Sequence, residues 1–148
     1  MTEHGLDLSD DFTGRPGAAF VVGGSGGLGA AVVRELAARG SDVAFTYRQN
    51  EASAAQLART VSDLGRQAWT IGLDLRNHDG CAQAIDAIAE AAGGINTLVY
   101  AAGPHVPQKH LSKVTPAEMQ EQLDADASGF FAVASPALPH LRQTEGSI

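Results

Sequence analysis

The chain has 148 residues and a mass of 15.3 kDa, with 44% hydrophobic and 18% charged residues, which suits one globular domain and excludes whole-chain disorder. Seventeen acidic residues against ten basic ones give a formal net charge of -7, and this disfavours binding to nucleic acid or anionic membranes through bulk charge. A lone cysteine, no apolar run near the ~20 residues of a membrane helix and no leader pattern make the cytoplasm the expected location.

Short apolar runs alternate along the chain with longer segments of helical period. After a flexible tail over residues 1–14, strands are predicted at Ala18–Val22, Asp42–Tyr47, Ala68–Leu73 and Asn96–Ala101. Helices are predicted at Ala30–Arg39, Glu51–Leu64, Asp79–Ala92 and from Thr115 to about Leu141. This alternation predicts one α/β domain over residues 15–148, with a parallel sheet covered by helices on both faces.

Two local signals concern the last helix. Thr115 as N-cap, Pro116 at the first helical position and Glu118 at the third form a capping box, which predicts the start of the helix. A break is expected around Pro136 and Pro139, because proline cannot donate the backbone hydrogen bond of a helix interior.

Five glycines fall within the eight residues from Val22 to Gly29, between the first strand and the first helix. They include G-x-G-x-x-G, which is weak alone and becomes a dinucleotide fingerprint in this strand–helix context. Such a turn lets a pyrophosphate approach free N–H groups and the positive end of the helix dipole. A bare glycine-rich connector is the alternative. P-loop chemistry is disfavoured because Ala30 and Ala31 stand where Lys and Ser or Thr are required.

The end of the second strand bears on the choice between NAD(H) and NADP(H). A site that prefers NAD usually places an Asp or Glu there to bind the ribose hydroxyl, whereas this chain reads Tyr47-Arg48-Gln49-Asn50. A guanidinium at Arg48 would pair with a 2′-phosphate through two charge-assisted hydrogen bonds. We therefore predict that NADP(H) is preferred, with NAD(H) still open and a solvated Arg48 as the alternative.

Four motifs in chain order resemble the short-chain dehydrogenase/reductase family. They are similar to its T-G-x-x-x-G-x-G turn, its acid–apolar pair at the adenine ring, its N-N-A-G and its D-x-N-x-x-G-x-F helix, and here they read Val22 to Gly29, Asp74-Leu75, Tyr100 to Gly103 and Asp124 to Phe131. Val22 replaces the threonine, and Tyr100 and Ala101 replace the two asparagines. The resemblance runs from about Phe12 to Ile148.

The resemblance implies a Rossmann-type doubly wound parallel sheet in strand order 3-2-1-4, with a fifth strand just starting at the C-terminus. It also implies hydride transfer between a nicotinamide cofactor and a small carbonyl or alcohol substrate. The residues it assigns to the cofactor are Gly23, Ser25, Gly26, Gly27, Leu28, Gly29, Tyr47, Arg48, Asp74, Leu75, Ala101, Ala102 and Gly103.

The family's catalytic Ser-Tyr-Lys group is not assigned here, because neither Tyr47 nor Tyr100 has a lysine four residues on. We expect that group after Ile148, so the chain reads as the cofactor-binding half of an enzyme. The family's catalytic asparagine maps onto Asp126, whose backbone carbonyl would hold a proton-relaying water; a polar residue tolerated in a helix is the alternative. A divergent dinucleotide-binding sensor without catalysis is the alternative function.

Three further expectations concern ligands and partners. His105 and His110 follow Gly103 on the side that borders substrate in the family, but no acid or thiol lies near them, so no metal site is predicted. The apolar last helix predicts a homo-oligomer, either a dimer or a tetramer. An unpaired edge on the fourth strand predicts that this segment alone would associate.

Overall fold

The computed structural model describes residues 12–103 and 108–148. In this part of the chain, four parallel strands form a sheet in the order β3-β2-β1-β4: β1 (Ala18–Val22), β2 (Val43–Tyr47), β3 (Ala68–Gly72) and β4 (Ile95–Tyr100). The helices are α1 (Gly27–Ala38), α2 (Glu51–Asp63), α3 (His78–Ala92), α4 (Pro116–Leu123) and α5 (Gly129–Gln143). The predicted α/β class and strand order are confirmed.

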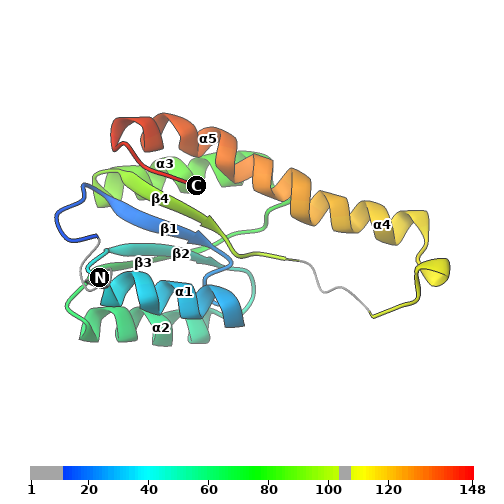
Figure 1. Cartoon of the computed structure of the whole chain (residues 1–148), viewed down its shortest axis with the longest axis horizontal. Coiled ribbons are helices and arrows are strands. Elements are labelled where there is room, and N and C mark those ends of the chain that lie inside the picture. Colours follow the sequence, from blue (N-terminus) through cyan, green and yellow to red (C-terminus); the bar gives the residue numbers. More distant parts are fainter. Residues whose placement is uncertain (1–11, 104–107) are drawn as a thin grey trace, which may run out of the picture.

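Helices cover both faces of the sheet. Figure 1 shows α1 and α2 on one side of the strands and α3 and α5 on the other. All five residues of β1 are fully buried, and they alternate between the two layers: Ala19 and Val21 pack toward α1 and α2, whereas Phe20 and Val22 pack toward α3 and α5. A continuous apolar run is therefore what a central parallel strand requires.

The strand register brings the carboxyl ends of the strands to one edge. Val22 lies beside Tyr100 of β4, and Tyr47 of β2 lies beside Gly72 of β3. The segments that follow β1, β2, β3 and β4 all leave from this edge. In open α/β sheets, ligands bind outside the carboxyl ends of the strands.

The predicted helix break at Pro136 and Pro139 is wrong, because α5 runs through both prolines to Gln143. Its buried residues, Val133, Ala134, Ala137 and Leu141, pack onto the core layer shared with α3 and β4. This burial outweighs the backbone hydrogen bonds that the prolines cannot make.

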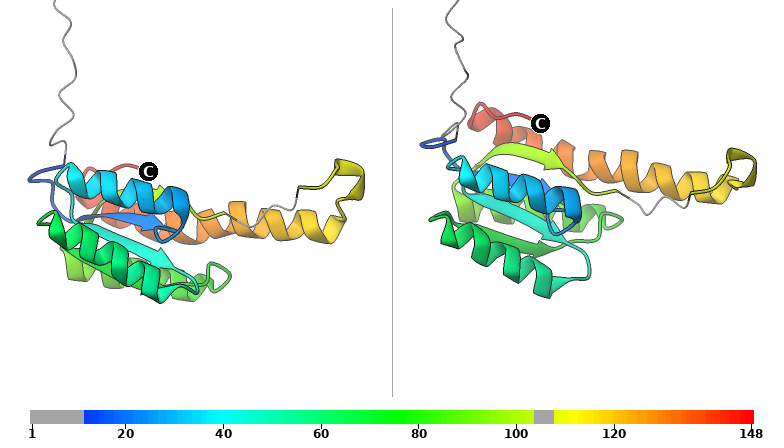
Figure 2. Two further views of the ribbon diagram at one scale, coloured as in Figure 1. Left: turned by 90° about the horizontal axis from the view of Figure 1, so that it is seen from below. Right: turned by 60° about the horizontal axis from the view of Figure 1, so that its bottom comes forward.

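The irregularity in this helix falls earlier, at a π turn, η2 (Asp124–Ser128), that joins α4 to α5. The three segments form one rod whose α4 end extends well beyond the sheet (Figures 1 and 2). The predicted capping box is confirmed at the start of α4, where the Glu118 N–H donates to Thr115 Oγ1 at 3.2 Å and the Thr115 N–H donates to Glu118 Oε2 at 2.9 Å.

At the N-terminal end, residues 1–11 of the predicted tail lie outside the described residues. Phe12 already contacts the domain: its N–H donates to the Arg39 carbonyl at 3.2 Å, and the Arg15 guanidinium lies 4.7 Å from its ring centroid.

At the C-terminal end, the outer edge of β4 is partly paired, so the prediction of an unpaired edge is wrong there. The Leu98 N–H donates to the Ser147 carbonyl at 2.9 Å, and the Ser147 N–H donates to the Asn96 carbonyl at 3.2 Å. The expected beginning of a fifth strand is thus present as a single parallel bridge. None of the described helices is both long and apolar enough to cross a membrane.

Candidate functional site

The glycine turn after β1 is shaped by contacts that exclude side chains. Gly23 has φ +78, and a Cβ there would lie 2.7 Å from the Cα and N of Ala102. A Cβ at Gly29 would lie 2.2 Å from the Gly23 carbonyl oxygen, and one at Gly24 would lie 2.4 Å from Phe45 Cβ. These three glycines let the turn fold tightly between β4 and the start of α1.

The turn ends in an open helix N-terminus. The α1 helix begins at Gly27, three residues before the predicted start at Ala30, because glycines can still adopt helical geometry here. Gly26 is the N-cap and makes no side-chain cap. Helix geometry leaves the N–H groups of Gly27, Leu28 and Gly29 without an intrahelical acceptor. A Cβ at Gly27 would meet nothing within 4 Å, and Leu28 is 73% exposed. This end of α1 therefore presents free donors and a positive dipole to solvent.

Thr46 anchors the turn to β2 and was missed in the sequence analysis. Its side chain is 3% exposed, and its Oγ1 accepts the Gly23 N–H at 2.8 Å, while its backbone carbonyl accepts the Ser25 N–H at 3.3 Å. The available signal was Val22, which stands where the resembling motif has threonine. Here the Thr46 hydroxyl on the neighbouring strand accepts the hydrogen bond of the Gly23 N–H in the turn.

The end of β2 carries no acidic side chain. Tyr47 is half-buried and its ring lies 3.5 Å from where a Cβ on Gly72 would be, while Arg48 is exposed. Within residues 12–103 and 108–148, Arg48 forms no ion pair. Arg48 therefore stands at the carboxyl edge with its charge available to an anion.

Asp74, after β3, is held by Arg76. The Arg76 side chain donates to both carboxylate oxygens, at 3.0 Å from Nε and 2.6 Å from Nη2, and its backbone N–H donates at 3.1 Å. These hydrogen bonds lower the pKa of Asp74 to about 2, with a smaller contribution from the charge of Arg48. Leu75 is half-buried and packs against the layer that contains α3 and α5.

The residues after β4 complete the edge. The Ala101 N–H donates to the Val22 carbonyl at 2.9 Å, which continues the pairing of β4 with β1, and Ala102 backs onto Gly23. Gly103 is exposed. The structure thus brings all thirteen predicted cofactor residues to the carboxyl edge of the sheet, where they lie at the end of β2 or on the segments that follow the four strands.

Tyr100 ties β4 to the π turn, a contact that the sequence analysis also missed. Its hydroxyl donates to the Ala125 carbonyl at 2.7 Å, and its ring meets Phe130 edge-on with centroids 5.5 Å apart. Gly129 makes room for this phenol, since a Cβ there would lie 2.7 Å from the Tyr100 oxygen. Burial, and secondarily the charge of Asp126, raises the pKa of Tyr100 to about 12, so the phenol remains a hydrogen-bond donor at neutral pH.

Asp126 lies exposed on the π turn next to this contact. The Gly129 N–H donates to the carbonyls of Asp124 and Asp126, so the Asp126 carbonyl accepts at least one backbone hydrogen bond. π turns occur often at functional sites.

Replacing Tyr100 with Phe is expected to lower the free energy of unfolding by ~1 kcal/mol, because the Ala125 carbonyl loses its donor. Tyr47→Phe is the matched control, since the Tyr47 hydroxyl makes no hydrogen bond within residues 12–103 and 108–148. Urea unfolding of both variants measures the difference. Equal stability of the Tyr100→Phe variant and the unmutated chain would contradict the assigned contact.

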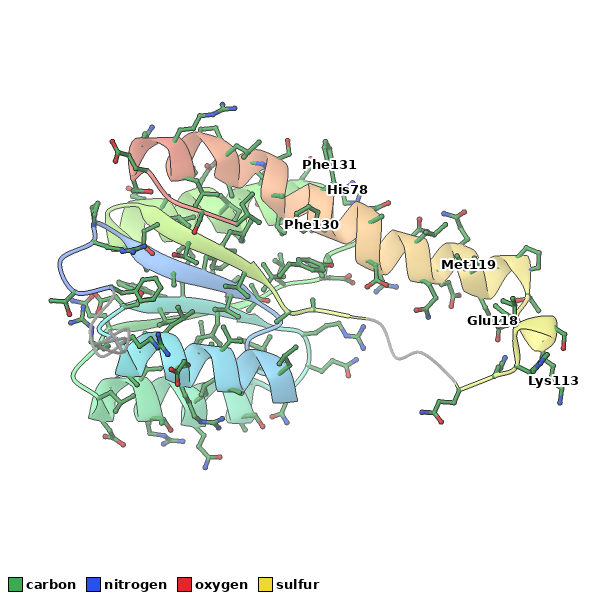
Figure 3. The ribbon with its side chains drawn as sticks, viewed as in Figure 1. His78, Lys113, Glu118, Met119, Phe130 and Phe131 are labelled. Carbon is green, nitrogen blue, oxygen red and sulfur yellow. The ribbon has the colours of Figure 1, made fainter. Side chains whose placement is uncertain are left out.

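The histidines give no metal cluster in the described part of the chain. His105 lies outside the described residues. His110 Nδ1 accepts the Ser112 N–H at 3.3 Å at the start of the short 3-10 turn η1 (Leu111–Lys113), and Lys109 pairs with Glu118. Lys113 and Glu118 lie at the far end of the rod in Figure 3, remote from the glycine turn. Within the described ranges, no three His, Cys, Asp or Glu side chains gather to hold a metal ion.

Comparisons with known proteins give one consistent family. A family model described as short chain dehydrogenase matches residues 17–148. The chain is 30% identical to 3-dehydrosphinganine reductase TSC10B of Arabidopsis thaliana over 127 residues, which cover 86% of this chain and 37% of that protein.

Solved structures agree with this match. A short-chain dehydrogenase/reductase from Serratia marcescens superposes with a TM-score of 0.80 at 28% identity, covering 88% of this chain and 52% of that one. A short chain dehydrogenase from Burkholderia cenocepacia, solved in complex with NADP, gives a TM-score of 0.77 at 32% identity, covering 86% and 52%. The chain thus spans about half the length of these structures.

Proposed function

The chain belongs to the short-chain dehydrogenase/reductase family, and from that membership we propose that it provides the cofactor-binding region of an NADP(H)-dependent oxidoreductase. The reaction would be hydride transfer between the nicotinamide and a small carbonyl or alcohol substrate. The observation that carries the proposal is the glycine turn, whose open helix N-terminus lies at the carboxyl edge of the sheet with Arg48 at the end of the adjacent strand.

The chain's own residues fit a dinucleotide. The N–H groups of Gly27, Leu28 and Gly29 would hold the pyrophosphate, because they lack intrahelical acceptors and no Cβ at Gly27 stands in the way. Asp74 and Leu75 would border the adenine, and Ala101 to Gly103 would line the path toward the nicotinamide. The bound cofactor would donate hydride to a carbonyl or accept it from an alcohol.

The preference for NADP(H) is proposed from charge. Arg48 is exposed at the end of β2, where an NAD-preferring site would have an acid. Asp74 lies close enough to Arg48 for the two charges to interact, and its carboxylate is already bonded to the Arg76 side chain. This pairing weakens the repulsion that Asp74 would exert on a 2′-phosphate.

Asp126 is proposed to act through its backbone rather than its carboxylate. Its carbonyl lies on a π turn that Tyr100 holds through the neighbouring Ala125 carbonyl. A water bound there would relay protons in the whole protein. Tyr100 is in this scheme a positioning residue, since its phenol stays protonated.

A sensor that binds the dinucleotide without turnover is the second candidate, favoured by Asp126, Tyr100 and Ala101 at positions where the family has asparagine. Incubating the whole protein with NADPH and a panel of ketones and aldehydes separates the two. Consumption of NADPH supports the enzyme, and binding without consumption across the panel supports the sensor.

We also propose self-association along α4 and α5 and a cytoplasmic location. Exposed apolar side chains follow the rod, among them Met119, Leu123, Phe130 and Phe131, and Phe131 projects away from the sheet in Figure 3. A dimer or a tetramer would cover them.

Arg48→Ala is expected to weaken NADPH binding by about 10- to 100-fold while leaving NADH binding unchanged, because only NADPH loses a charge-assisted partner. Calorimetric titration with each cofactor measures the two dissociation constants. Arg59→Ala, at an exposed position on α2, is the control and should change neither. If the ratio of the dissociation constants for NADPH and NADH is the same in Arg48→Ala as in the unmutated chain, Arg48 does not bind the cofactor's 2′-phosphate.

A further inference from the structure

The outer edge of β3 is unpaired within the described residues. β3 lies at one end of the sheet and pairs with β2 alone. The Leu73 N–H donates to the Tyr47 carbonyl at 2.9 Å, and alternate residues of a strand face the same neighbour, so the odd-numbered residues of this segment face β2. The N–H and C=O groups of Ala68, Thr70 and Gly72 therefore point outward, where no strand of the described part of the chain meets them.

The strand lacks the features that usually protect an open edge from pairing. Its five residues, Ala68–Gly72, include no charged side chain and no proline. Its register with β2 runs without a bulge from Val43 opposite Ala68 to Tyr47 opposite Gly72. Thr70 at its centre is exposed. Because natural proteins block open edges with lysine, proline or a bulge, an edge without them is suited to pairing with another strand.

The sequence of β3 complements itself in an antiparallel pair. When two copies are aligned about Thr70, this residue lies opposite the partner's Thr70, and Trp69 lies opposite the partner's Ile71. Threonine pairs and pairs of an aromatic with a β-branched side chain are favourable cross-strand neighbours. Trp69 and Ile71 are half-buried against the layer of α3 and α5, and the pairing would complete their cover.

The residues just beyond β3 also complement one another in charge. The same alignment brings Arg66 opposite the partner's Asp74 at each end of the pair. Within the chain, Arg66 Nη2 lies 2.9 Å from Asp42 Oδ1, and Arg76 Nη2 lies 2.6 Å from Asp74 Oδ2. The four side chains would therefore alternate in sign along the junction. A shift of two residues would instead place Arg66 opposite the partner's Arg76, so the charges favour the alignment about Thr70.

The flank of α2 above this edge carries small side chains. Ser53, Gln56 and Thr60 face α1 across the pocket between the two helices. Helical periodicity places Ala58 and Ser62 on the opposite flank, which overhangs β3. A two-fold axis perpendicular to the sheet would bring the α2 helices of both copies together on one face, and these small side chains leave room for that approach.

We propose that β3 pairs with β3 of a second copy of this chain, antiparallel and with two-fold symmetry about Thr70. The sheets of the two copies would join into one continuous sheet, held by hydrogen bonds between the outward N–H and C=O groups of Ala68, Thr70 and Gly72. This interface is separate from the association proposed along α4 and α5, because α5 contacts β4 at the opposite end of the sheet. Two self-pairing surfaces on one chain build a tetramer or a longer row of copies.

Thr70→Lys tests the pairing at its centre. Two positive charges would lie directly opposite each other across the axis, which is expected to raise the dissociation constant of the pair by about tenfold or more. Sedimentation velocity of the whole protein should then show half the mass of the unmutated assembly. Thr70 is exposed, so the urea midpoint of unfolding should not change. Thr70→Val, which adds no charge at the same position, is the matched control and should keep the full mass.

Thr70→Cys provides a second, positive measurement. A short bifunctional maleimide is expected to join two copies of the whole protein through position 70, because the two-fold axis passes beside it. The native Cys81 is fully buried and should not react. Arg59→Cys, exposed on α2, is the control and should give no linked dimer, since helical periodicity places it away from the flank that overhangs β3.

Phe131→Ser, on the exposed apolar side of α5, separates this interface from the one proposed along α4 and α5. If Phe131→Ser halves the mass and Thr70→Lys does not, the β3 pairing is overturned and the helical interface stands. If Thr70→Lys halves the mass and Phe131→Ser does not, the β3 pairing is supported and the helical interface fails. Absence of a linked dimer in Thr70→Cys overturns the β3 pairing, and the edge is then open or holds a different partner.

Discussion

Gly29→Ala is expected to destabilise the domain and abolish cofactor binding, whereas Gly27→Ala, two residues earlier, is expected to weaken binding alone. A methyl group on Gly29 would lie 2.2 Å from the Gly23 carbonyl oxygen and 2.8 Å from Gly24 Cα, both backbone atoms that cannot rotate away. The turn must open to relieve this overlap, at a cost of ~3 kcal/mol or more. The free N–H groups of α1 then lose their position relative to β2.

Gly27→Ala is the matched control, because Gly27 belongs to the same glycine-rich segment as Gly29. A methyl group there meets nothing within 4 Å, and alanine favours a helix by up to ~1 kcal/mol over glycine, so stability should hold or rise slightly. The same methyl group would project into the approach of the pyrophosphate and weaken NADPH by about tenfold or more. Urea unfolding and calorimetric titration give both quantities. A Gly29→Ala variant as stable as the unmutated chain would contradict the geometry of the turn.

Thr46→Val is expected to lower the free energy of unfolding by ~1–3 kcal/mol and to weaken cofactor binding by about tenfold. Valine matches the shape of threonine but removes Oγ1, the acceptor of the Gly23 N–H at 2.8 Å, inside a site where Thr46 is 3% exposed. The loss of this hydrogen bond frees the glycine turn from β2.

Thr46→Ser distinguishes the hydroxyl from the side-chain volume. Serine keeps Oγ and loses a methyl group, so it should retain most of the cofactor affinity while losing some stability. The comparison uses chemical unfolding and NADPH titration on the two variants. If the Thr46→Val and Thr46→Ser variants bind NADPH with the same affinity, the Thr46 hydroxyl does not hold the glycine turn.

The sheet and the glycine turn were predictable because their signals are local. Apolar runs such as Ala18–Val22 stop in glycine, and the alternation with helical segments dictates parallel strands. The capping box at Thr115 likewise depends on residues three apart, and it is present as predicted. Strand order came from the family resemblance.

The contacts between distant segments were not predictable from the same patterns. The hydrogen bond between Thr46 and Gly23 joins residues 23 positions apart, and the one between Tyr100 and Ala125 joins residues 25 positions apart. Neither pair therefore has a periodic signature in the sequence. The only signs in the sequence were two departures from the family motifs: Val22 stands where the motif has the threonine, and Tyr100 stands where it has an asparagine.

The prolines of α5 show propensity overridden by packing. Pro136 and Pro139 predict a break. The helix nevertheless continues past both prolines, because Val133 and Ala137 on its apolar side are fully buried. The irregularity is instead the π turn at Asp124–Ser128, where no residue within the turn is buried and where the Tyr100 hydroxyl donates to the Ala125 carbonyl.

Titrating NADPH and NADH separately into the unmutated chain tests the central proposal most directly. We expect NADPH to bind at least tenfold more tightly than NADH, because its 2′-phosphate alone meets Arg48 at the end of β2. Equal affinity for the two cofactors, or no binding of either by the folded chain, would contradict it.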